Sequence, residues 1–410
     1  MSKQDKEVVF PEKRFLGFSA LEGWQLATIG QHLKESRTKG NKGDTAKKLT
    51  VKLWGNGVYE KNESLKGSPN TQYYRRKAGQ FIYSKLDFLN QAFGIIPEHL
   101  DNYESTVDLP CFDVGSELDA RFLLEYVQRE DFYKTFGEIA DGGRKAKRIQ
   151  VDVFLNFPIY LPKFEEQQKI ADCLSSVDEL IAAEEQKLDY LKAHKKGLMN
   201  ELFPISGETV PKRRFPEYRD SGEWIERRLE QAADYVNGKA HEQDIDEQGK
   251  YTVVNSKFIS TEGKVKKYSN TASLLARKGD ILMVLSDVPN GKALAKCFYV
   301  DKDDSYTVNQ RICKLTATDA VSVLLFYSLD RNTYFLKFDD GVKQTNLRKD
   351  DVLNCPILLP KDKGEQQKIA KTLLTIDELI TEQGQKIASL RTHKKGLMQQ
   401  LFPSMEEVLL

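Results

Sequence analysis

A duplicated segment constrains this chain more than any other feature. Residues 166–204 read EQQKIADCLSSVDELIAAEEQKLDYLKAHKKGLMNELFP, and residues 365–403 read EQQKIAKTLLTIDELITEQGQKIASLRTHKKGLMQQLFP. The two segments are identical at 23 of 39 positions without a gap, which chance does not produce. The chain therefore contains two copies of one unit of about 200 residues, within the two or three domains that its length suggests.

Weaker similarity extends outward from the duplicated segment. It includes Arg14-Phe15 with Arg214-Phe215, Trp24 with Trp224, Gly79-Gln80-Phe81-Ile82 with Gly279-Asp280-Ile281-Leu282, and two Leu-Pro ends at Pro162 and Pro360. Each unit thus has a variable globular part followed by a nearly constant segment. We expect a globular domain at 1–162, a central helix at 163–204, a second globular domain at 205–360 and a C-terminal helix at 361–410. A protein that needs two different recognition domains on one shared framework would produce this pattern.

The duplicated segments are predicted to be long helices. Both are rich in helix-forming residues and lack an internal proline, and Pro204 and Pro403 end them. Apolar residues recur in heptads, and both seams are interrupted at the same place, by Glu184 and Gln383. The predicted seam consists of Ile170, Leu174, Val177, Ile181, Leu188, Leu191, Leu198, Ile369, Leu373, Ile376, Ile380, Ile387, Leu390 and Leu397. We expect the helices to pair as an antiparallel coiled coil; two separate hairpins, or helices packed on their own domains, are the alternative.

The globular parts have the pattern of a mixed α/β (α+β) fold. Short β-rich runs between turn signals predict strands at 79–83, 251–254, 280–285 and 297–300, and helices are expected at 118–127 and 320–329. The predicted architecture is therefore two α+β domains separated by two long helices, with a pseudo-two-fold internal repeat.

Charge is balanced overall but unevenly spread. The chain has 62 Lys+Arg against 61 Asp+Glu, which excludes a wholly basic protein. Residues 1–100 carry 17 basic and 10 acidic side chains, and residues 251–300 carry 8 and 3, whereas residues 101–138 carry 3 and 10. Two basic segments in matching parts of the repeat suit two polyanion-facing surfaces.

Several function classes lack their usual signals. The five cysteines are scattered and form no C-x-x-C pair, so we expect neither disulfides nor a cysteine zinc site, and a reducing cytoplasm is the expected location. The polar N-terminus is unlike a signal peptide, and no apolar run approaches the ~20 residues that span a membrane. There is no P-loop, G-x-G-x-x-G or H-E-x-x-H motif. His194 and His393 share a repeat position and are expected to be polar residues beside the seam.

One stretch is a possible decoy. Residues 156–160, NFPIY, faintly resemble the Asn/Asp-Pro-Pro-aromatic motif of amino-methyltransferases, which grip an extruded base. The second proline is missing, and the repeat copy at 354–358, NCPIL, also lacks the aromatic residue. We interpret both as strands that lead into the long helices.

The order of these motifs resembles the specificity subunit of type I restriction-modification systems. The resemblance covers nearly the whole chain: a Gly-Glu-Trp opening at 222–224, weaker at 22–24, the Leu-Pro junctions, the EQQKIA starts and the LFP ends. It implies that each variable part is a target recognition domain for one half of a bipartite double-stranded DNA site, with the coiled coil setting the spacer. It also implies two methylation subunits that carry S-adenosylmethionine and a motor-nuclease subunit that uses ATP and Mg. This chain would be non-catalytic, with no cofactor and no membrane partner.

Candidate DNA contacts lie in polar, basic stretches, where Lys and Arg would bind phosphates and Arg, Asn and Gln would read base edges. They are Lys42, Lys47, Lys48, Tyr73, Tyr74, Arg75, Arg76, Arg144, Lys145, Lys147, Arg148, Lys264, Lys266, Lys267, Arg277, Lys292, Lys343, Gln344, Asn346 and Arg348. The loops after Asp141 and Asp340 occupy matching positions and rank first. Lys195, Lys196, Lys394 and Lys395 are expected to be surface or partner-facing residues instead.

Two other functions stay open from the residues alone. The first is an adaptor whose coiled coil joins two protein-binding domains without DNA. The second is a self-sufficient nuclease or methylase, for which no residue cluster stands out. Salt-dependent DNA affinity separates the first from a DNA-recognition subunit, and activity of the purified chain alone would reveal the second.

Overall fold

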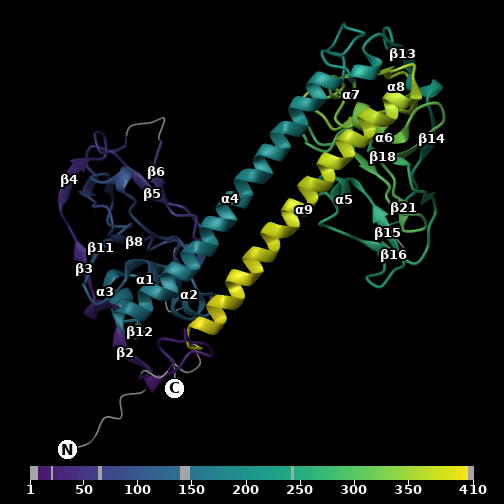
Figure 1. Ribbon diagram of the computed structural model, residues 1–410. Coiled ribbons are helices and arrows are strands. Elements are labelled where there is room, and N and C mark those ends of the chain that lie inside the picture. The colour runs from purple at the N-terminus through teal and green to yellow at the C-terminus, as the bar shows by residue number, and fades with distance from the viewer. Residues whose placement is uncertain (1–7, 20–21, 63–66, 139–147, 242–243, 405–410) are drawn as a thin grey trace, which may run out of the picture. The chain divides into compact units, whose positions relative to one another are not determined.

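Two long helices connect the parts of this chain. The computed structural model describes residues 8–19, 22–62, 67–138, 148–241 and 244–404. The chain divides into unit 1, which comprises Met1–Gln186 and Gly384–Leu410, and unit 2, which comprises Lys187–Gln383. Helices α4 (Phe164–Leu202) and α9 (Lys363–Leu401) each have one half in either unit (Figure 1).

The two helices coincide with the duplicated segments, which confirms the helix prediction. Each begins after a Leu-Pro junction, and acidic side chains lie in its first turn, where they favour the positive end of the helix dipole. Pro204 and Pro403 follow the last helical turns. None of the fourteen predicted seam residues is exposed, whereas Leu180 and Leu379, which share a repeat position outside the seam, are 44% and 45% exposed.

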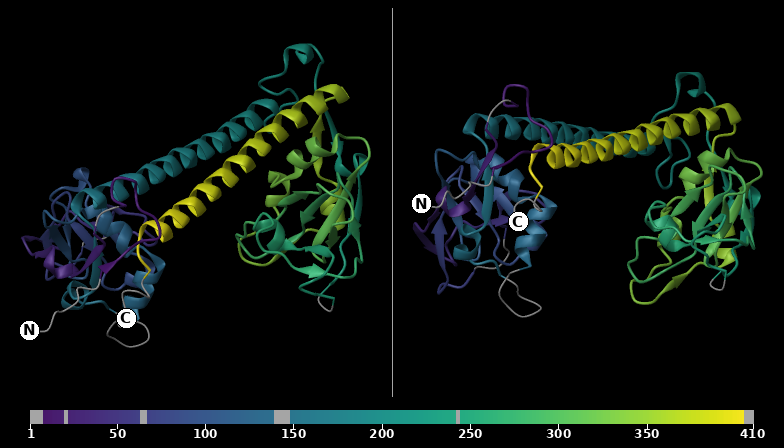
Figure 2. Two further views of the ribbon diagram at one scale, coloured as in Figure 1. Left: turned by 60° about the horizontal axis from the view of Figure 1, so that its bottom comes forward. Right: turned by 90° about the horizontal axis from the view of Figure 1, so that it is seen from below.

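Within each unit the two helix halves run antiparallel (Figure 2). In unit 1, Lys394 of α9 pairs with Asp178 of α4 at 2.7 Å, and Arg391 pairs with Glu185 at 2.5 Å. Residue numbers therefore increase in opposite directions along the two paired halves. Glu184, the predicted break in the seam, accepts a 2.5 Å hydrogen bond from Lys386.

The described residues of unit 1 form four small sheets and three short α-helices besides the ends of α4 and α9. The sheets are β1-β2-β12 (Val8–Val9, Trp24–Thr28, Pro158–Leu161), β3-β11-β8-β9 (Leu33–Ser36, Cys111–Val114, Phe81–Tyr83, Phe93–Ile95), β10-β7-β4 (Glu104–Ser105, Gln72–Arg75, Lys39–Lys42) and β5-β6 (Leu49–Val51, Val58–Glu60). The helices are α1 (Ala120–Val127), α2 (Glu130–Gly137) and α3 (Val151–Leu155). All named strand pairs in this unit are antiparallel.

Unit 2 repeats this plan with different strands. Its sheets are β13-β24 (Ile225–Arg228, Pro356–Leu359), β14-β22-β18-β20 (Ala233–Asn237, Ile312–Ala317, Ile281–Val284, Cys297–Tyr299), β16-β15-β21-β17 (Tyr268–Ser269, Tyr251–Val254, Tyr306–Val308, Leu275–Ala276) and β19-β23 (Ser286–Asp287, Thr345–Asn346). The helices are α5 (Ser256–Ser260), α6 (Ser322–Leu329), α7 (Thr333–Leu336) and α8 (Lys349–Leu353). The pair β15–β21 is parallel.

A fully buried strand explains the weak sequence match around residues 79–82 and 279–282. In β8, Phe81 and Tyr83 face the main aromatic cluster, whereas Ile82 faces a second apolar cluster. In β18, Ile281 and Met283 face one cluster and Leu282 and Val284 the other. Alternate side chains point to opposite faces of a strand, so a strand between two cores is apolar throughout. Gly79 and Gly279, which precede the two strands, both have positive φ.

The mixed α+β fold class is confirmed, as are the six predicted short elements within a few residues. The decoy stretch at 156–160 begins with Asn156, the C-cap of α3, and its last three residues belong to strand β12. Tyr160 is fully buried, and its backbone N–H donates to the Tyr126 hydroxyl at 3.2 Å. This aromatic ring is therefore a core residue.

Candidate nucleic-acid interface

The first residues of the duplicated motif anchor each long helix to its globular part. Arg14 donates from Nε and Nη2 to both oxygens of Glu166, at 2.9 and 2.5 Å. Arg214 binds Glu365 in the same bidentate way, at 2.8 and 2.6 Å. Both glutamate side chains are 1% exposed. Removing one partner of such a pair would leave a buried charge unpaired, which accounts for the presence of Arg and Glu in both copies.

The glutamine after each glutamate joins the helix to the strand before it. The Gln167 side chain donates to the Pro162 carbonyl at 3.0 Å and accepts from the Asp119 N–H at 2.9 Å. Its counterpart Gln366 donates to the Pro360 carbonyl at 2.7 Å and accepts from the Val321 N–H at 2.9 Å. The motif thus fixes the β12–α4 and β24–α9 corners and also binds the N-cap residues of α1 and α6, which come earlier in the chain.

The first lysine of each HKKG motif, at residues 194–197 and 393–396, forms an ion pair with an aspartate of the other long helix. Lys195 binds Asp377 at 2.6 Å in unit 2, and Lys394 binds Asp178 at 2.7 Å in unit 1. Both lysine side chains are largely buried, at 25% and 16% exposure. The expectation that these two lysines are simply surface or partner-facing residues is therefore wrong, because each is committed to a carboxylate within its own unit. Lys196 and Lys395 are exposed as expected.

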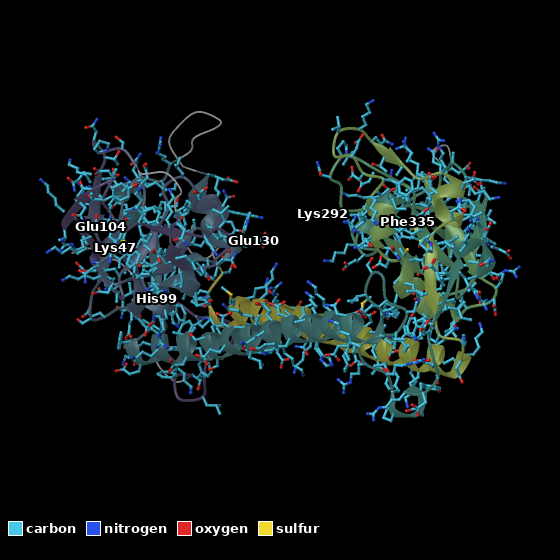
Figure 3. All side chains as sticks on the ribbon, turned by 90° about the horizontal axis from the view of Figure 1, so that it is seen from above. Lys47, His99, Glu104, Glu130, Lys292 and Phe335 are labelled. Carbon is cyan, nitrogen blue, oxygen red and sulfur yellow. The ribbon has the colours of Figure 1, made fainter. Side chains whose placement is uncertain are left out.

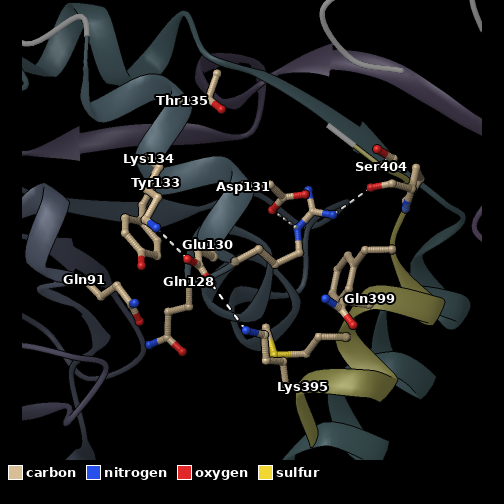
Figure 4. A pocket seen from close by; sticks show the side chains of 14 residues that line it. Gln91, Gln128, Glu130, Asp131, Tyr133, Lys134, Thr135, Lys395, Gln399 and Ser404 are labelled. Atoms are coloured by element: carbon tan, nitrogen blue, oxygen red, sulfur yellow. Dashed lines mark hydrogen bonds and ion pairs between the residues drawn. The ribbon is translucent and has the colours of Figure 1, made fainter. Parts of the chain in front are cut away.

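The end of α9 closes a surface pocket of unit 1 beside α2, with a volume of about 850 Å³ (Figure 4). Arg129 donates from Nη1 to the Pro403 carbonyl at 2.8 Å, and its guanidinium lies over the Phe402 ring. Glu130 accepts from Lys134 at 2.5 Å and from Lys395 at 3.4 Å. These contacts join the end of α9 to the start of α2.

In unit 1 the structure gathers several predicted contacts on adjacent strands β4 and β7. Lys42 pairs with Gln72 across the strands, and Tyr73, Tyr74 and Arg75 follow on β7. Lys42 and Arg75 are exposed and the two tyrosines are half-buried. We call Lys42, Tyr73, Tyr74 and Arg75 the β4–β7 surface. Cations beside aromatic rings suit both phosphate binding and base contact.

A buried carboxylate holds this surface in shape. Glu104 of β10 is 2% exposed and accepts from the backbone N–H of Asn41 at 2.8 Å and from its Nδ2 at 2.7 Å. Its own N–H donates to the Lys47 carbonyl at 2.6 Å, and Figure 3 shows Lys47 close to Glu104. Lys47 is exposed beside the β4–β7 surface.

Two predicted contacts of unit 1 lie in its interior. Arg76 is 2% exposed and donates to the Ser105 hydroxyl and to the carbonyls of Ser36, Thr106 and Leu109. Lys48 is 8% exposed, and its ammonium lies over the Tyr73 ring. Both cations stabilise the domain from within, and we leave them out of the proposed contact set.

Of the predicted contacts in the loop after Asp141, Arg148 is among the described residues. Arg144, Lys145 and Lys147 lie outside the described residues. Arg148 is half-buried, with Nε 3.7 Å from Asp108 Oδ1. Replacing these four cations with alanine would test whether this loop binds DNA, with a flatter salt dependence as the expected result.

In unit 2 the predicted contacts around residues 292 and 343–346 meet. The short strands β19 and β23 pair, with Ser286 opposite Asn346. Residues 286–293 and 339–346 therefore form what we call the two-loop surface, with exposed Lys292, Lys343, Gln344 and Asn346. Figure 3 shows Lys292 at the surface of this unit, in contrast to the buried Phe335. Arg348, at the N-cap of α8, is exposed just beyond the second loop.

The remaining predicted contacts lie on other segments of unit 2. Lys264, Lys266 and Lys267 are exposed between α5 and β16, and Arg277 is exposed after β17. The Arg277 N–H donates to Asp280, which also pairs with Lys314 at 3.6 Å. No interaction within the described part of the chain joins these four residues to the two-loop surface.

Sequence reasoning missed the residues that shape these surfaces. Glu104, Asp287 and Asp339 each accept hydrogen bonds from backbone N–H groups of the loops. It also missed Asp178 and Asp377 as lysine partners. The signal for the last two was present, because both fall at the same identical position of the repeat.

The ionisable groups of the described residues bear on metal binding and on nucleophilic chemistry. Within the described ranges, no cluster of three or more His, Cys, Asp or Glu side chains is suited to a metal ion. Burial raises the pKa of Cys111, Cys313 and Cys355 to about 12, so these thiols are protonated at neutral pH. No helix in the described part of the chain is long and apolar enough to span a membrane.

Comparison with known proteins identifies the architecture. Residues 116–193 and 221–391 match the type I restriction modification DNA specificity domain. The chain is 24% identical over 416 residues to the type I restriction enzyme MjaVIII specificity subunit of Methanocaldococcus jannaschii, covering 95% of this chain and 94% of that protein.

Two solved structures share the fold. The S subunit of a type I restriction-modification system from M. genitalium aligns with a TM-score of 0.62 at 14% identity, over 97% of this chain and 100% of that chain. A chain from work on complex assembly and conformational transition of the type I R-M system aligns with a TM-score of 0.55 at 15% identity, over 93% and 98%.

Proposed function

The chain belongs to the type I restriction-modification DNA specificity family, and on that premise we propose that it is the sequence-specific DNA-binding subunit of such a complex. Two target recognition domains, residues 1–162 and 205–360, read the two halves of a bipartite double-stranded DNA site. The helices at 163–204 and 361–410 set the unread spacer between the halves.

The observation that carries this proposal is the contrast between constant anchors and divergent surfaces. The Arg–Glu and Lys–Asp pairs are the same in both units. The surfaces that gather the predicted contacts lie on different elements of the two units. In unit 1 they are exposed Lys and Arg with half-buried Tyr on β4 and β7, and in unit 2 they are exposed Lys, Gln and Asn on the two-loop surface. Phosphate contacts from Lys and Arg would position each domain, and the other side chains would read bases.

Catalysis is assigned to partner subunits. Two methylation subunits would bind S-adenosylmethionine and methylate adenine, and motor-nuclease subunits would use ATP and Mg to translocate and cleave DNA. The complex would act in the cytoplasm. This chain would then direct the chemistry without contributing a catalytic residue.

The first test is DNA binding by the complex of this chain with its cognate methylation subunits across a salt series. We expect log affinity to fall linearly with log salt. The double variant Lys42→Ala/Arg75→Ala should lower the slope by about two, since each lost phosphate contact lowers it by about one. Lys302→Ala, which removes an exposed lysine of unit 2, is the matched control and should leave the slope unchanged.

The second test identifies the target. Co-expression with the methylation subunits, followed by genome-wide mapping of methyladenine, should give a two-part motif with a fixed gap. A complex without salt-dependent DNA affinity would eliminate the proposal and leave the protein-binding adaptor. Methylation or cleavage by the purified chain alone would contradict the division of labour.

A further inference from the structure

Three aspartates tie the two-loop surface of unit 2 together: Asp287 and Asp339 are half-buried, and Asp340 is exposed. Asp287 accepts from the N–H groups of Val288 at 2.9 Å, Ala293 at 2.6 Å and Leu294 at 3.1 Å. A Cβ on Gly291 would lie 2.1 Å from the same carboxylate, so a larger residue there would displace the Asp287 side chain. The first loop is therefore wrapped around one side chain.

The second loop is fixed in the same way and is docked on the first. Asp340 accepts from the N–H groups of Val342 at 2.9 Å and Lys343 at 3.0 Å. The Asn290 N–H donates to Asp339 at 3.1 Å, and its Nδ2 donates to the Gly341 carbonyl at 3.3 Å. Groups presented by these loops need little ordering when a ligand binds.

Two exposed amides on this frame have opposite hydrogen-bonding roles. Gln344 Nε2 donates to Ser286 Oγ at 2.7 Å and to Asn346 Oδ1 at 3.3 Å. An amide nitrogen has two donors, and both are engaged in Gln344, which leaves its acceptor oxygen available to a ligand. Asn346 Oδ1 accepts from Gln344, and the Nδ2 donors of Asn346 are available to a ligand. The pair offers one acceptor and one donor side by side.

This pattern matches one base edge in the major groove. Adenine presents the N6 amino donor beside the N7 acceptor, guanine presents two acceptors, cytosine a donor, and thymine an acceptor with a methyl group. We propose that Gln344 and Asn346 read an adenine, with Gln344 Oε1 accepting from N6 and Asn346 Nδ2 donating to N7. A guanine would place its O6 against Gln344 Oε1, an acceptor against an acceptor.

The surrounding charges favour this placement. Lys292, Lys343 and Arg348 are exposed at the same loops and can bind the phosphates on either side of the base. The inference rests on the proposed DNA-binding function and adds the identity of one base in the half-site of unit 2.

The experiment uses base analogues on the wild-type complex with its methylation subunits. Once the methyladenine motif is known, each adenine of the half-site assigned to unit 2 is replaced by 7-deazaadenine, which lacks the N7 acceptor, or by purine, which lacks the N6 donor. At one adenine, each analogue should weaken binding about tenfold, in line with the discrimination that good bidentate contacts provide. All other adenines should tolerate 7-deaza replacement.

Substitutions at Gln344 and Asn346 then test which side chain contacts which atom of the adenine. Asn346→Ala should bind more weakly and become insensitive to 7-deazaadenine at that position, whereas Gln344→Ala should become insensitive to purine. Asn346→Asp keeps the side-chain shape and replaces the donor with an acceptor, so it should lose adenine preference without unfolding. Lys292→Ala is the contrast: it should weaken all duplexes equally and lower the salt slope by about one.

The outcomes separate the two proposals. A wild-type complex without salt-dependent duplex affinity would refute DNA recognition itself. A complex that binds its motif but shows no analogue-sensitive adenine, or whose Gln344→Ala and Asn346→Ala variants methylate the same motif with unchanged selectivity, would refute the adenine assignment alone. A preference of this position for guanine would also overturn it.

Discussion

Glu125 shows how one residue can differ where the repeat is otherwise symmetric. It occupies the sixth position of α1, binds Lys394 at 3.0 Å and is 6% exposed. The sixth position of α6 is Tyr327, whose hydroxyl donates to Asp377 at 2.6 Å beside Lys195. The same Lys–Asp pair is thus completed by a carboxylate in unit 1 and by a phenol in unit 2.

This difference predicts a pH dependence of stability in unit 1. Burial raises the pKa of Glu125 above its ordinary value of 4.5, although Lys394 opposes the shift. The folded state then binds the proton more tightly than the unfolded state, so the contribution of Glu125 is largest below its unfolded pKa and declines as pH rises through the raised pKa. Glu125→Gln should remove that decline.

The measurement is the difference in free energy of unfolding between wild type and Glu125→Gln from about pH 4 to pH 8. We expect wild type to lose stability relative to the variant as pH rises. Tyr327→Phe is the matched control and should give a flat difference, because burial and the Asp377 contact raise the pKa of Tyr327 away from this range. A difference for Glu125→Gln that stays flat, or grows in favour of wild type, would refute the assignment.

At the scale of elements, the sequence was sufficient for the long helices and insufficient for the sheets. Heptads, proline boundaries and 23 identities locate α4 and α9, because helical structure depends on neighbours along the chain. Strand order depends on contacts distant in sequence, such as β2 with β12, and no local pattern specifies it. The burial of Arg76 and Lys48 could not be predicted for the same reason. A positive charge by itself favours an exposed position, and the carbonyls that surround the Arg76 guanidinium are brought there by contacts distant in sequence.

A substitution at the helix seam tests its role within each unit. Leu390 in unit 1 and Leu191 in unit 2 are half-buried seam residues. Replacing either by Asp should lower the free energy of unfolding by about 2 kcal/mol, because charge enters an apolar contact. Leu180→Asp and Leu379→Asp are controls on the same helices at exposed positions and should change it by less than about 0.5 kcal/mol.

Urea unfolding of the four single variants measures these effects. Equal losses at seam and exposed positions would show that the seam has no special contribution. The pairing of α4 with α9 along their whole length, as a ruler, remains a prediction that these variants do not address.

At the scale of the whole molecule, both units contain the same contact at the end of a long helix. In each, the segment that leads into the globular part donates a backbone hydrogen bond to the last turn of that helix. The Arg213 N–H donates to the Glu201 carbonyl at 3.0 Å in unit 2, and the Lys13 N–H donates to the Gln400 carbonyl at 2.9 Å in unit 1. In unit 2 these residues are joined by a short connection. In unit 1 they belong to opposite ends of the sequence, and the docked contact takes the place of the connection.

This equivalence predicts that the chain tolerates circular permutation. Joining the residues after Pro403 to those before Lys13 through a linker as long as the connection between Pro204 and Arg213, and opening the chain within that connection, keeps every described contact of both units. The permuted protein should unfold at nearly the same urea concentration as wild type and direct methylation to the same motif. An insoluble product, or a changed motif, would contradict the equivalence.

The repeated contacts of the two helical segments also have a consequence for the gene. The segments share 23 of 39 residues, so the coding stretch of either one is a place where modules from related genes can be joined. Because the Arg–Glu and Lys–Asp contacts are the same at both junctions, a crossover inside either stretch yields a chain whose ends still fit. New pairings of DNA-reading modules can therefore arise in one step, without any new point mutation in the frame that carries them.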